Sequence, residues 1–132
     1  YQHYAIAVSD TKVLQMPKEY FYRTCGENCN FHSVLISNML SILARKAFYL
    51  NQKINILSSN TLRQKISKLL LSNSSKDGNV KFDMNREELA DYLNVARPSL
   101  SRELMKMQED GLIEIDRNRI KIIDFEEIQN IF

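Results

Sequence analysis

The sequence predicts a mainly helical fold with a small β component, which places the chain in the α+β class. Three features predict it: an apolar repeat of one long helix at residues 33–57, two short helices at 85–110, and two apolar runs flanking a polar turn at 116–119. The chain has 132 residues, of which 44% are hydrophobic, enough for a packed core. We therefore expect a long helix joined to a compact C-terminal domain.

The composition excludes several functional classes. Lys and Arg number 18 against 16 Asp and Glu, and a net charge of +2 excludes a bulk polycation, so any nucleic-acid contact must depend on where charges lie. The three dispersed glycines offer no phosphate-binding loop, and we find no paired carboxylates or nucleophile with a base, so an enzyme is not expected. Without an apolar run near 18 residues or a signal-peptide pattern, a cytoplasmic protein without membrane contact is expected.

Two cysteines lie near the N-terminal end. Cys25 and Cys29 are four residues apart, and His32 follows them closely. A structural zinc site needs four ligands, usually in two pairs, whereas this segment offers one pair and one histidine. We interpret the cysteines as reduced thiols rather than as a redox or metal switch, and we expect no metal site and no cofactor in this chain.

Residues 4–16, YAIAVSDTKVLQM, contain two apolar runs around the turn-forming cluster Ser9-Asp10-Thr11. This pattern predicts a β-hairpin that Pro17 terminates. A lone hairpin is marginally stable in water, so it needs a surface on which to pack. The helix that follows is the one this sequence offers.

The longest helix is predicted from about Ser33 to Leu57, with two apolar stripes along it. One stripe repeats at alternating steps of four and three residues over three heptads: Ile36, Leu40, Leu43, Ala47, Leu50, Ile54 and Leu57. The other consists of Leu35, Met39, Ile42 and Tyr49. A strict 3.5-residue repeat favours a parallel coiled-coil homodimer on the first stripe, with the hairpin packed on the second. The alternative is the central core helix of a monomer.

A pair of short helices is predicted next, after a helix over about 61–71, a loop and a short strand at 80–82. Asn85 and Glu88 form a capping-box pattern that begins the first helix of the pair, and Asn94 tolerates the left-handed conformation that a tight turn requires. The second helix begins at Arg97, because Pro98 is tolerated in a first turn, and it ends before Gly111. Such a pair is a helix-turn-helix.

The second helix of this pair has two distinct faces. Leu100, Leu104 and Met107 form its inward stripe. The outward face carries small and basic residues, which allow close approach to base edges in the DNA major groove: Arg97, Pro98, Ser99, Ser101, Arg102 and Lys106. Strands at 112–115 and 120–123 follow, and the basic tip between them resembles the wing of a winged helix, which most often contacts phosphate. Asp124 caps a final short helix.

With these elements placed, the chain resembles the Crp/Fnr family of bacterial regulators, the relatives of the cyclic-AMP receptor protein. Three segments resemble, in order, the last strands of the family's effector barrel, the first helix of its DNA-binding domain and its winged-helix signature: AIAVSDTKVLQMPKEYF, TLRQKISKLLL and NREELADYLNVARPSLSRELMKMQEDGLIEIDRNRIKIID. The resemblance implies a sequence-specific transcriptional regulator that binds a palindromic double-stranded DNA site as a homodimer and contacts RNA polymerase.

The resemblance also implies roles for individual residues. The predicted base contacts are Arg97, Pro98, Ser101 and Arg102. The predicted phosphate contacts are Asn85, Arg86, Ser99, Lys106, Arg117 and Arg119. Two positions depart from the family pattern: Pro98 stands where many members have a glutamate, which puts the operator sequence in doubt, and Ala96 replaces a capping serine or threonine at a cost of about 1 kcal/mol.

The resemblance divides the chain into a remnant of the effector-binding β-barrel (1–32), a dimerisation helix (33–58) and a winged helix-turn-helix domain (59–132). Most of the barrel and its ligand pocket are expected to be missing, so the sequence is interpreted as a truncated product or a fragment with an unassigned effector. The alternative function is a winged-helix protein-interaction module without specific DNA binding. Its support is the charge of residues 85–123, which contain seven Lys and Arg against eight Asp and Glu.

Overall fold

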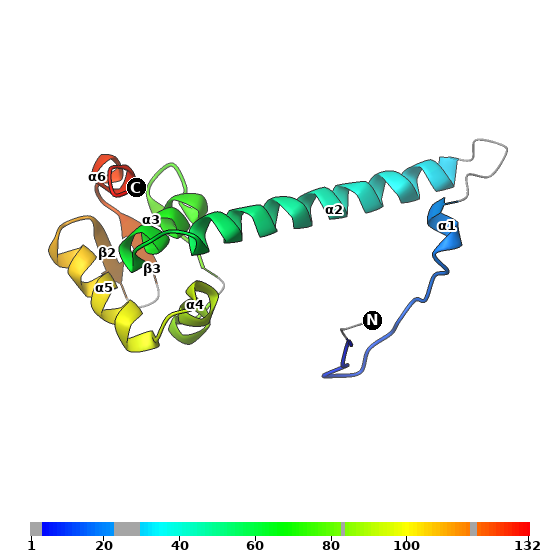
Figure 1. The fold of residues 1–132 in the computed structure, drawn as a ribbon, viewed down its shortest axis with the longest axis horizontal. Coiled ribbons are helices and arrows are strands. Elements are labelled where there is room, and N and C mark those ends of the chain that lie inside the picture. Colours follow the sequence, from blue (N-terminus) through cyan, green and yellow to red (C-terminus); the bar gives the residue numbers. More distant parts are fainter. Residues whose placement is uncertain (1–3, 23–29, 83, 117–118) are drawn as a thin grey trace. The chain divides into compact units, whose positions relative to one another are not determined.

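The computed structural model describes residues 4–22, 30–82, 84–116 and 119–132 (Figure 1). The predicted thiols Cys25 and Cys29 and the predicted phosphate contact Arg117 therefore lie outside the described residues. The chain forms two compact units, residues 1–46 and 47–132, and each is considered by itself. In the described parts of both units the structure is mainly helical with one small antiparallel sheet, which confirms the predicted fold class.

The predicted hairpin over residues 4–16 is wrong. The described chain there contains no strand and bends at Val8–Asp10, where the Thr11 hydroxyl donates to the Ser9 carbonyl at 2.8 Å. The apolar side chains that would have packed a hairpin face solvent: Val8 is 96% exposed. An isolated two-stranded hairpin without a covered apolar face is marginally stable, which is the physical reason for the difference. Helix α1 follows at Glu19–Tyr22.

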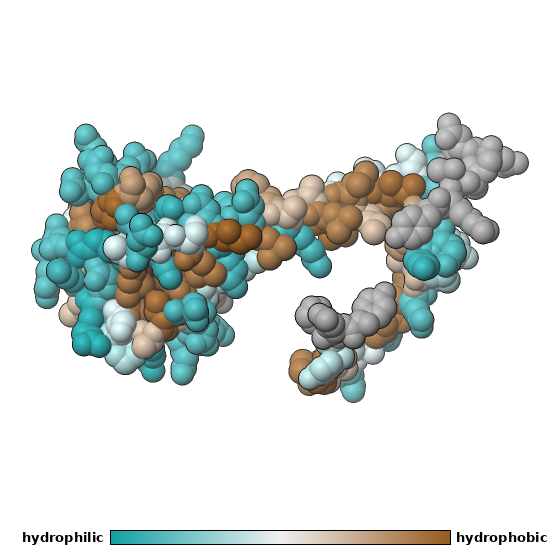
Figure 2. Space-filling model, in the orientation of Figure 1, coloured by the Kyte–Doolittle hydropathy of each residue, from teal (hydrophilic) through white to brown (hydrophobic). Residues whose placement is uncertain are grey.

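Helix α2 runs from Asn30 to Leu57, three residues longer at its start than predicted. The apolar residues of the heptad stripe remain uncovered in the single chain, with exposed fractions of 61% for Leu40 and 64% for Ile54. Figure 2 shows hydrophobic residues along this helix. Within the described residues, no helix is both long enough and apolar enough to span a membrane.

The second unit contains three further helices of two or more turns, a three-stranded sheet and a short last helix. In chain order these are α3 (Leu62–Asn73), β1 (Asn79–Val80), α4 (Arg86–Leu93), α5 (Arg97–Glu109), β2 (Ile113–Asp116), β3 (Arg119–Ile122) and α6 (Phe125–Gln129). The sheet order is β1-β3-β2 with antiparallel pairing throughout, and Ile113 lies opposite Ile122. β2 begins one residue later than predicted, and β3 ends one residue earlier.

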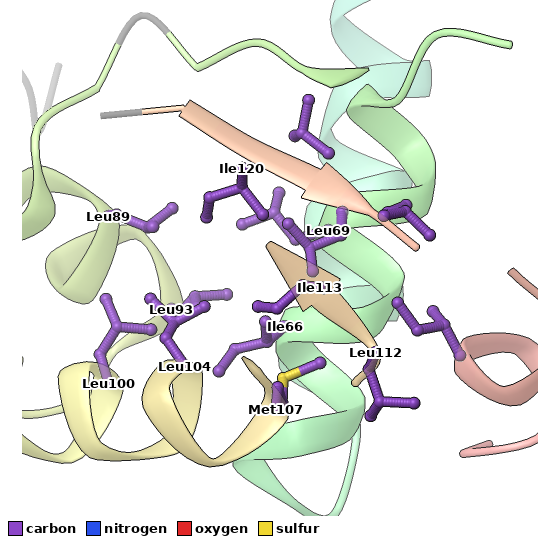
Figure 3. Packing of buried hydrophobic residues seen from close by; sticks show 14 of the residues in the cluster. Ile66, Leu69, Leu89, Leu93, Leu100, Leu104, Met107, Leu112, Ile113 and Ile120 are labelled. Atoms are coloured by element: carbon purple, nitrogen blue, oxygen red, sulfur yellow. The ribbon is translucent and has the colours of Figure 1, made fainter. Parts of the chain in front are cut away.

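One hydrophobic core joins these elements (Figure 3). The inward stripe predicted for α5 is confirmed, since Leu100, Leu104 and Met107 are all at most 2% exposed. They meet side chains from α3, α4 and the sheet, including Ile66, Leu69, Leu89, Leu93, Leu112, Ile113 and Ile120. Burial of each such side chain contributes roughly 1.5–3 kcal/mol. This core holds α5 with its other face turned outward.

Candidate nucleic-acid interface

Helix α4 begins with the predicted capping box. The side-chain oxygen of Asn85 accepts hydrogen bonds from the backbone N–H of Glu87 (2.9 Å) and Glu88 (3.0 Å), and the Glu88 carboxylate accepts from the N–H of Asn85 (2.7 Å). Because the Oδ1 atom of Asn85 serves the helix end, a phosphate contact by this residue would use its side-chain amide N–H₂.

The turn between α4 and α5 depends on Asn94. Its φ of 53° is left-handed, as predicted, and the next N–H, of Val95, donates to the carbonyl of Ala90 at 3.0 Å. The N–H of Asn94 donates to Asp91 at 3.0 Å. This pair of bonds is the Schellman helix ending, and it reverses the chain within three residues. Helices α4 and α5 therefore form a helix-turn-helix (Figure 1).

The first turn of α5 lacks a side-chain cap. Ala96 occupies the N-cap position and forms no side-chain hydrogen bond, while Pro98 lies within the first turn, as the sequence predicted. The carbonyl of Ala96 accepts from the N–H of Leu100 at 3.1 Å, so the helix is regular from its start. An N-terminus without a capping side chain leaves its backbone N–H groups and its positive dipole end available to an anion such as phosphate.

The outward face of α5 is exposed. The structure leaves Ser99 partly buried and the other five residues assigned to this face exposed: Arg97, Pro98, Ser101, Arg102 and Lys106. In the unbound chain the Arg102 Nε atom donates to the Pro98 carbonyl oxygen, one turn earlier on the same helix, at 3.3 Å. Base contact by Arg102 would replace this weak intrahelical bond, so the side chain is available to a ligand.

Sequence reasoning missed one residue on this face and one link behind it. Met105, four residues after Ser101, is 57% exposed, and the regular helical spacing of the two residues was the signal that could have found it. The Gln108 side-chain oxygen accepts from the backbone N–H of Ile115 in β2 at 2.9 Å. This bond ties the last turn of α5 to the predicted wing.

A second missed feature fixes α5 from the opposite side. The Arg63 side chain on α3 donates from Nε to the Glu103 carboxylate at 2.6 Å and from a terminal nitrogen to the Asp110 carboxylate at 2.7 Å. The hydrogen bond to Glu103 raises the pKa of the Arg63 guanidinium, against the opposing effect of burial, and the bond to Asp110 adds to the rise. Arg63 thus joins α3 to two points on α5, one near its middle and one at its end.

Replacing Arg63 by methionine is expected to lower the preference for an operator over random duplex, because α5 loses its two-point attachment to α3. The coupling energy between Arg63→Met and Glu103→Gln in a double-mutant cycle of unfolding should be about 0.5–1 kcal/mol, since both groups are partly exposed. Denaturant unfolding and anisotropy titrations measure the two effects. Lys65→Met, on the same helix, is the control, and equal losses of preference for both methionine variants would contradict the assignment.

Arg86 begins α4 and is half-buried. Burial lowers the pKa of its guanidinium from the ordinary value, yet an arginine stays charged under all ordinary conditions. Within the described residues it forms no ion pair, so its charge is available to a phosphate, which is the role predicted for it.

The sheet places one predicted phosphate contact at the tip of the wing. Arg119 is exposed at the start of β3, opposite Asp116 in the ladder, and Lys121 on the same strand lies opposite Glu114. This alternation of sign keeps the exposed sheet face near neutral. Any excess of positive charge toward DNA must therefore come from α5, the start of α4 and the tip.

The C-terminal part of α2 contacts the helix-turn-helix through Tyr92. The amine of Lys53 lies 4.8 Å from the centre of the Tyr92 ring, a cation–π contact. Burial raises the pKa of the Tyr92 hydroxyl, and Tyr49 contributes to the rise through charge interaction and hydrogen bonding. Within the second unit, α4 is therefore attached to the end of the long helix. Among the described residues, no cluster of three or more His, Cys, Asp or Glu is arranged to hold a metal.

A helix-turn-helix with an exposed basic second helix, followed by an antiparallel hairpin, defines a winged helix-turn-helix protein. The sequence pattern of the Crp-like helix-turn-helix domain matches residues 64–131, which is more than half of the chain. The chain therefore belongs to the Crp/Fnr family of transcriptional regulators, as the resemblance predicted.

Several known proteins are similar to this chain. The transcriptional activator protein FnrA of Stutzerimonas stutzeri is 24% identical over 127 residues, which cover 91% of this chain and 50% of FnrA. A CRP-family transcriptional regulator from Thermus thermophilus shares the fold with a TM-score of 0.60 and 22% identity, covering 77% of this chain and 54% of its own. FixK2 of Bradyrhizobium japonicum gives a TM-score of 0.62 at 19% identity, covering 74% and 52%. The chain spans about half the length of each relative.

Proposed function

We propose that this chain is a sequence-specific DNA-binding regulator of transcription that acts as a homodimer on a palindromic site. The observation that carries the proposal is the exposed face of α5, which presents Arg97 and Arg102 beside small residues at the uncapped helix start. Arginine recognises guanine through two parallel hydrogen bonds in the major groove, and small neighbours let the helix approach. The family to which the chain belongs supports the same function.

The homodimer is proposed from α2. Its heptad stripe is uncovered in the single chain, and an uncovered apolar face on a helix of 28 residues requires a partner. A second copy of the same helix fits a 3.5-residue repeat. Two copies of the helix-turn-helix would then present two recognition helices one DNA turn apart, about 34 Å, to two half-sites.

The second candidate function is a protein-interaction module, favoured by the absence of net positive charge in residues 85–123. The two candidates differ in their response to salt. A DNA-binding protein releases counterions from phosphates, so its affinity falls steeply as salt rises, with a slope close to the number of phosphates neutralised. A protein-interaction module has no such steep dependence on random duplex.

The test is selection and sequencing of duplexes bound from a random pool, followed by anisotropy titrations at several salt concentrations. Recovery of a palindrome with half-sites one helical turn apart is the expected result. Weak binding without enrichment of any sequence, at every salt concentration, would contradict the proposal. Arg119→Ala should weaken binding to all sequences alike and reduce the salt slope by about one unit, because a phosphate contact carries no sequence information.

A further inference from the structure

An exposed apolar side chain lies within the basic face of α5. Met105 is 57% exposed, whereas the other apolar residues of the middle and end of this helix, Leu100, Leu104 and Met107, are at most 2% exposed. Its side chain therefore contributes little to the core. It points to the side of the helix on which the proposed base contacts lie.

The spacing of Met105 places it in line with those contacts. It follows Ser101 by four residues and Arg102 by three, and side chains at these separations are neighbours on one helix face. Ser101 is small and exposed, so it does not cover Met105. Because an α-helix rises about 1.5 Å per residue, Met105 lies about 12 Å along the axis from Arg97. That distance is about three and a half base steps of 3.4 Å, so Met105 would meet a different base pair from the one at the helix start.

The chemistry of the major groove identifies the partner of such a side chain. Donors and acceptors line the base edges of the groove, and the C5-methyl of thymine is the apolar group among them. Methionine is flexible and polarisable, so it adapts to a methyl group of fixed position. The guanidinium groups of Arg97 and Arg102 address hydrogen-bond acceptors and leave this methyl unread.

We infer that Met105 is a specificity-determining residue that contacts the C5-methyl of a thymine in each half-site. The inference rests on the proposed function and adds to it the class of base that this part of α5 selects. It predicts one thymine position per half-site at which the methyl group itself, and not the hydrogen-bonding pattern of the base, carries the preference.

The test uses the operator recovered by selection from a random pool. Each thymine in turn is replaced by deoxyuridine, which removes the methyl and leaves the hydrogen-bonding groups in place. Affinities are measured by anisotropy for the unaltered protein, Met105→Ala and Met105→Leu. At one symmetric position, deoxyuridine should weaken the unaltered protein about fourfold per half-site, or about fifteenfold for both, the worth of one buried methyl group. Met105→Ala should bind the two operators equally, and Met105→Leu should retain most of the discrimination.

Ile123→Ala is the matched control, because Ile123 is also an exposed apolar residue, at 53%, but lies beyond the end of β3. It should discriminate deoxyuridine as the unaltered protein does. Equal sensitivity of the unaltered protein and Met105→Ala at every thymine would overturn the inference while leaving the proposed function intact. Enrichment of an operator without a thymine at a symmetric position would do the same. Failure to enrich any operator would remove the proposed function, and the inference with it.

Discussion

Replacing Leu43 and Leu50 of α2 together by glutamate is expected to convert the protein to a monomer and to lower its affinity for the palindromic operator by more than about a hundredfold. Both residues belong to the heptad stripe and are at least half exposed in the single chain, so the change costs the monomer little. In a coiled coil, four buried carboxylates would meet across the seam, and each would lose its hydration without gaining a partner. The loss of affinity follows because linked half-site contacts exceed a single contact by roughly 10²–10⁴-fold.

Sedimentation measures the mass of the variant, and anisotropy titrations measure its affinity. The matched control is Phe48→Glu, which makes a similar apolar-to-acidic change on the same helix. Phe48 is 66% exposed and lies outside both apolar stripes, so this variant should remain a dimer with unaltered affinity. A double variant that still sediments as a dimer would show that the heptad stripe is not the seam.

Replacing Arg102 by alanine is expected to lower operator affinity by about 1–3 kcal/mol, or roughly fivefold to 150-fold, and to relax the base preference at one position of each half-site. Arg102 is exposed, and its intrahelical bond to the Pro98 carbonyl is long, so the folded chain loses almost nothing. Arg102→Lys keeps the charge but has no planar fork, so it should lose most of the specificity while retaining affinity for random duplex.

The measurement is a set of titrations against operators in which each base pair is altered in turn. The unaltered protein should distinguish the altered position, and Arg102→Ala should not. If Arg102→Ala instead weakened binding equally to the operator and to random duplex, Arg102 would be a phosphate contact, and the assignment of the base-reading face would be wrong.

The local features of the helix-turn-helix were predictable from sequence because each one depends on neighbouring residues. The capping box joins Asn85 to a residue three positions later, and the turns at Asn94 and Gly111 require a left-handed backbone that few residue types accept. The inward stripe of α5 followed from the helical period. These are interactions within one or two turns of chain, and a sequence displays them directly.

The features that sequence reasoning missed depend on distant contacts. Arg63 binds carboxylates 40 and 47 residues further along the chain, and no local pattern pairs an arginine with either one. The hairpin at residues 4–16 failed for the same reason, since strand pairing depends on neighbours that a short apolar run does not specify. Gly78 is a third case. A Cβ atom there would lie 2.5 Å from the Ile122 carbonyl oxygen, a constraint that exists only once β1 has paired with β3.

The hydrogen bond from the Ile115 backbone to the Gln108 side chain bears on how proteins of this design acquire new targets. The strand that leads to the tip of the wing is bonded to the last turn of the base-reading helix, so the two meet DNA as one rigid piece. Substitutions on the exposed face of α5 can then change which letters are read while the set of backbone phosphates touched stays the same. A lineage that drifts to a new operator would inherit its old footprint, and the spacing of half-sites would change more slowly than their sequence.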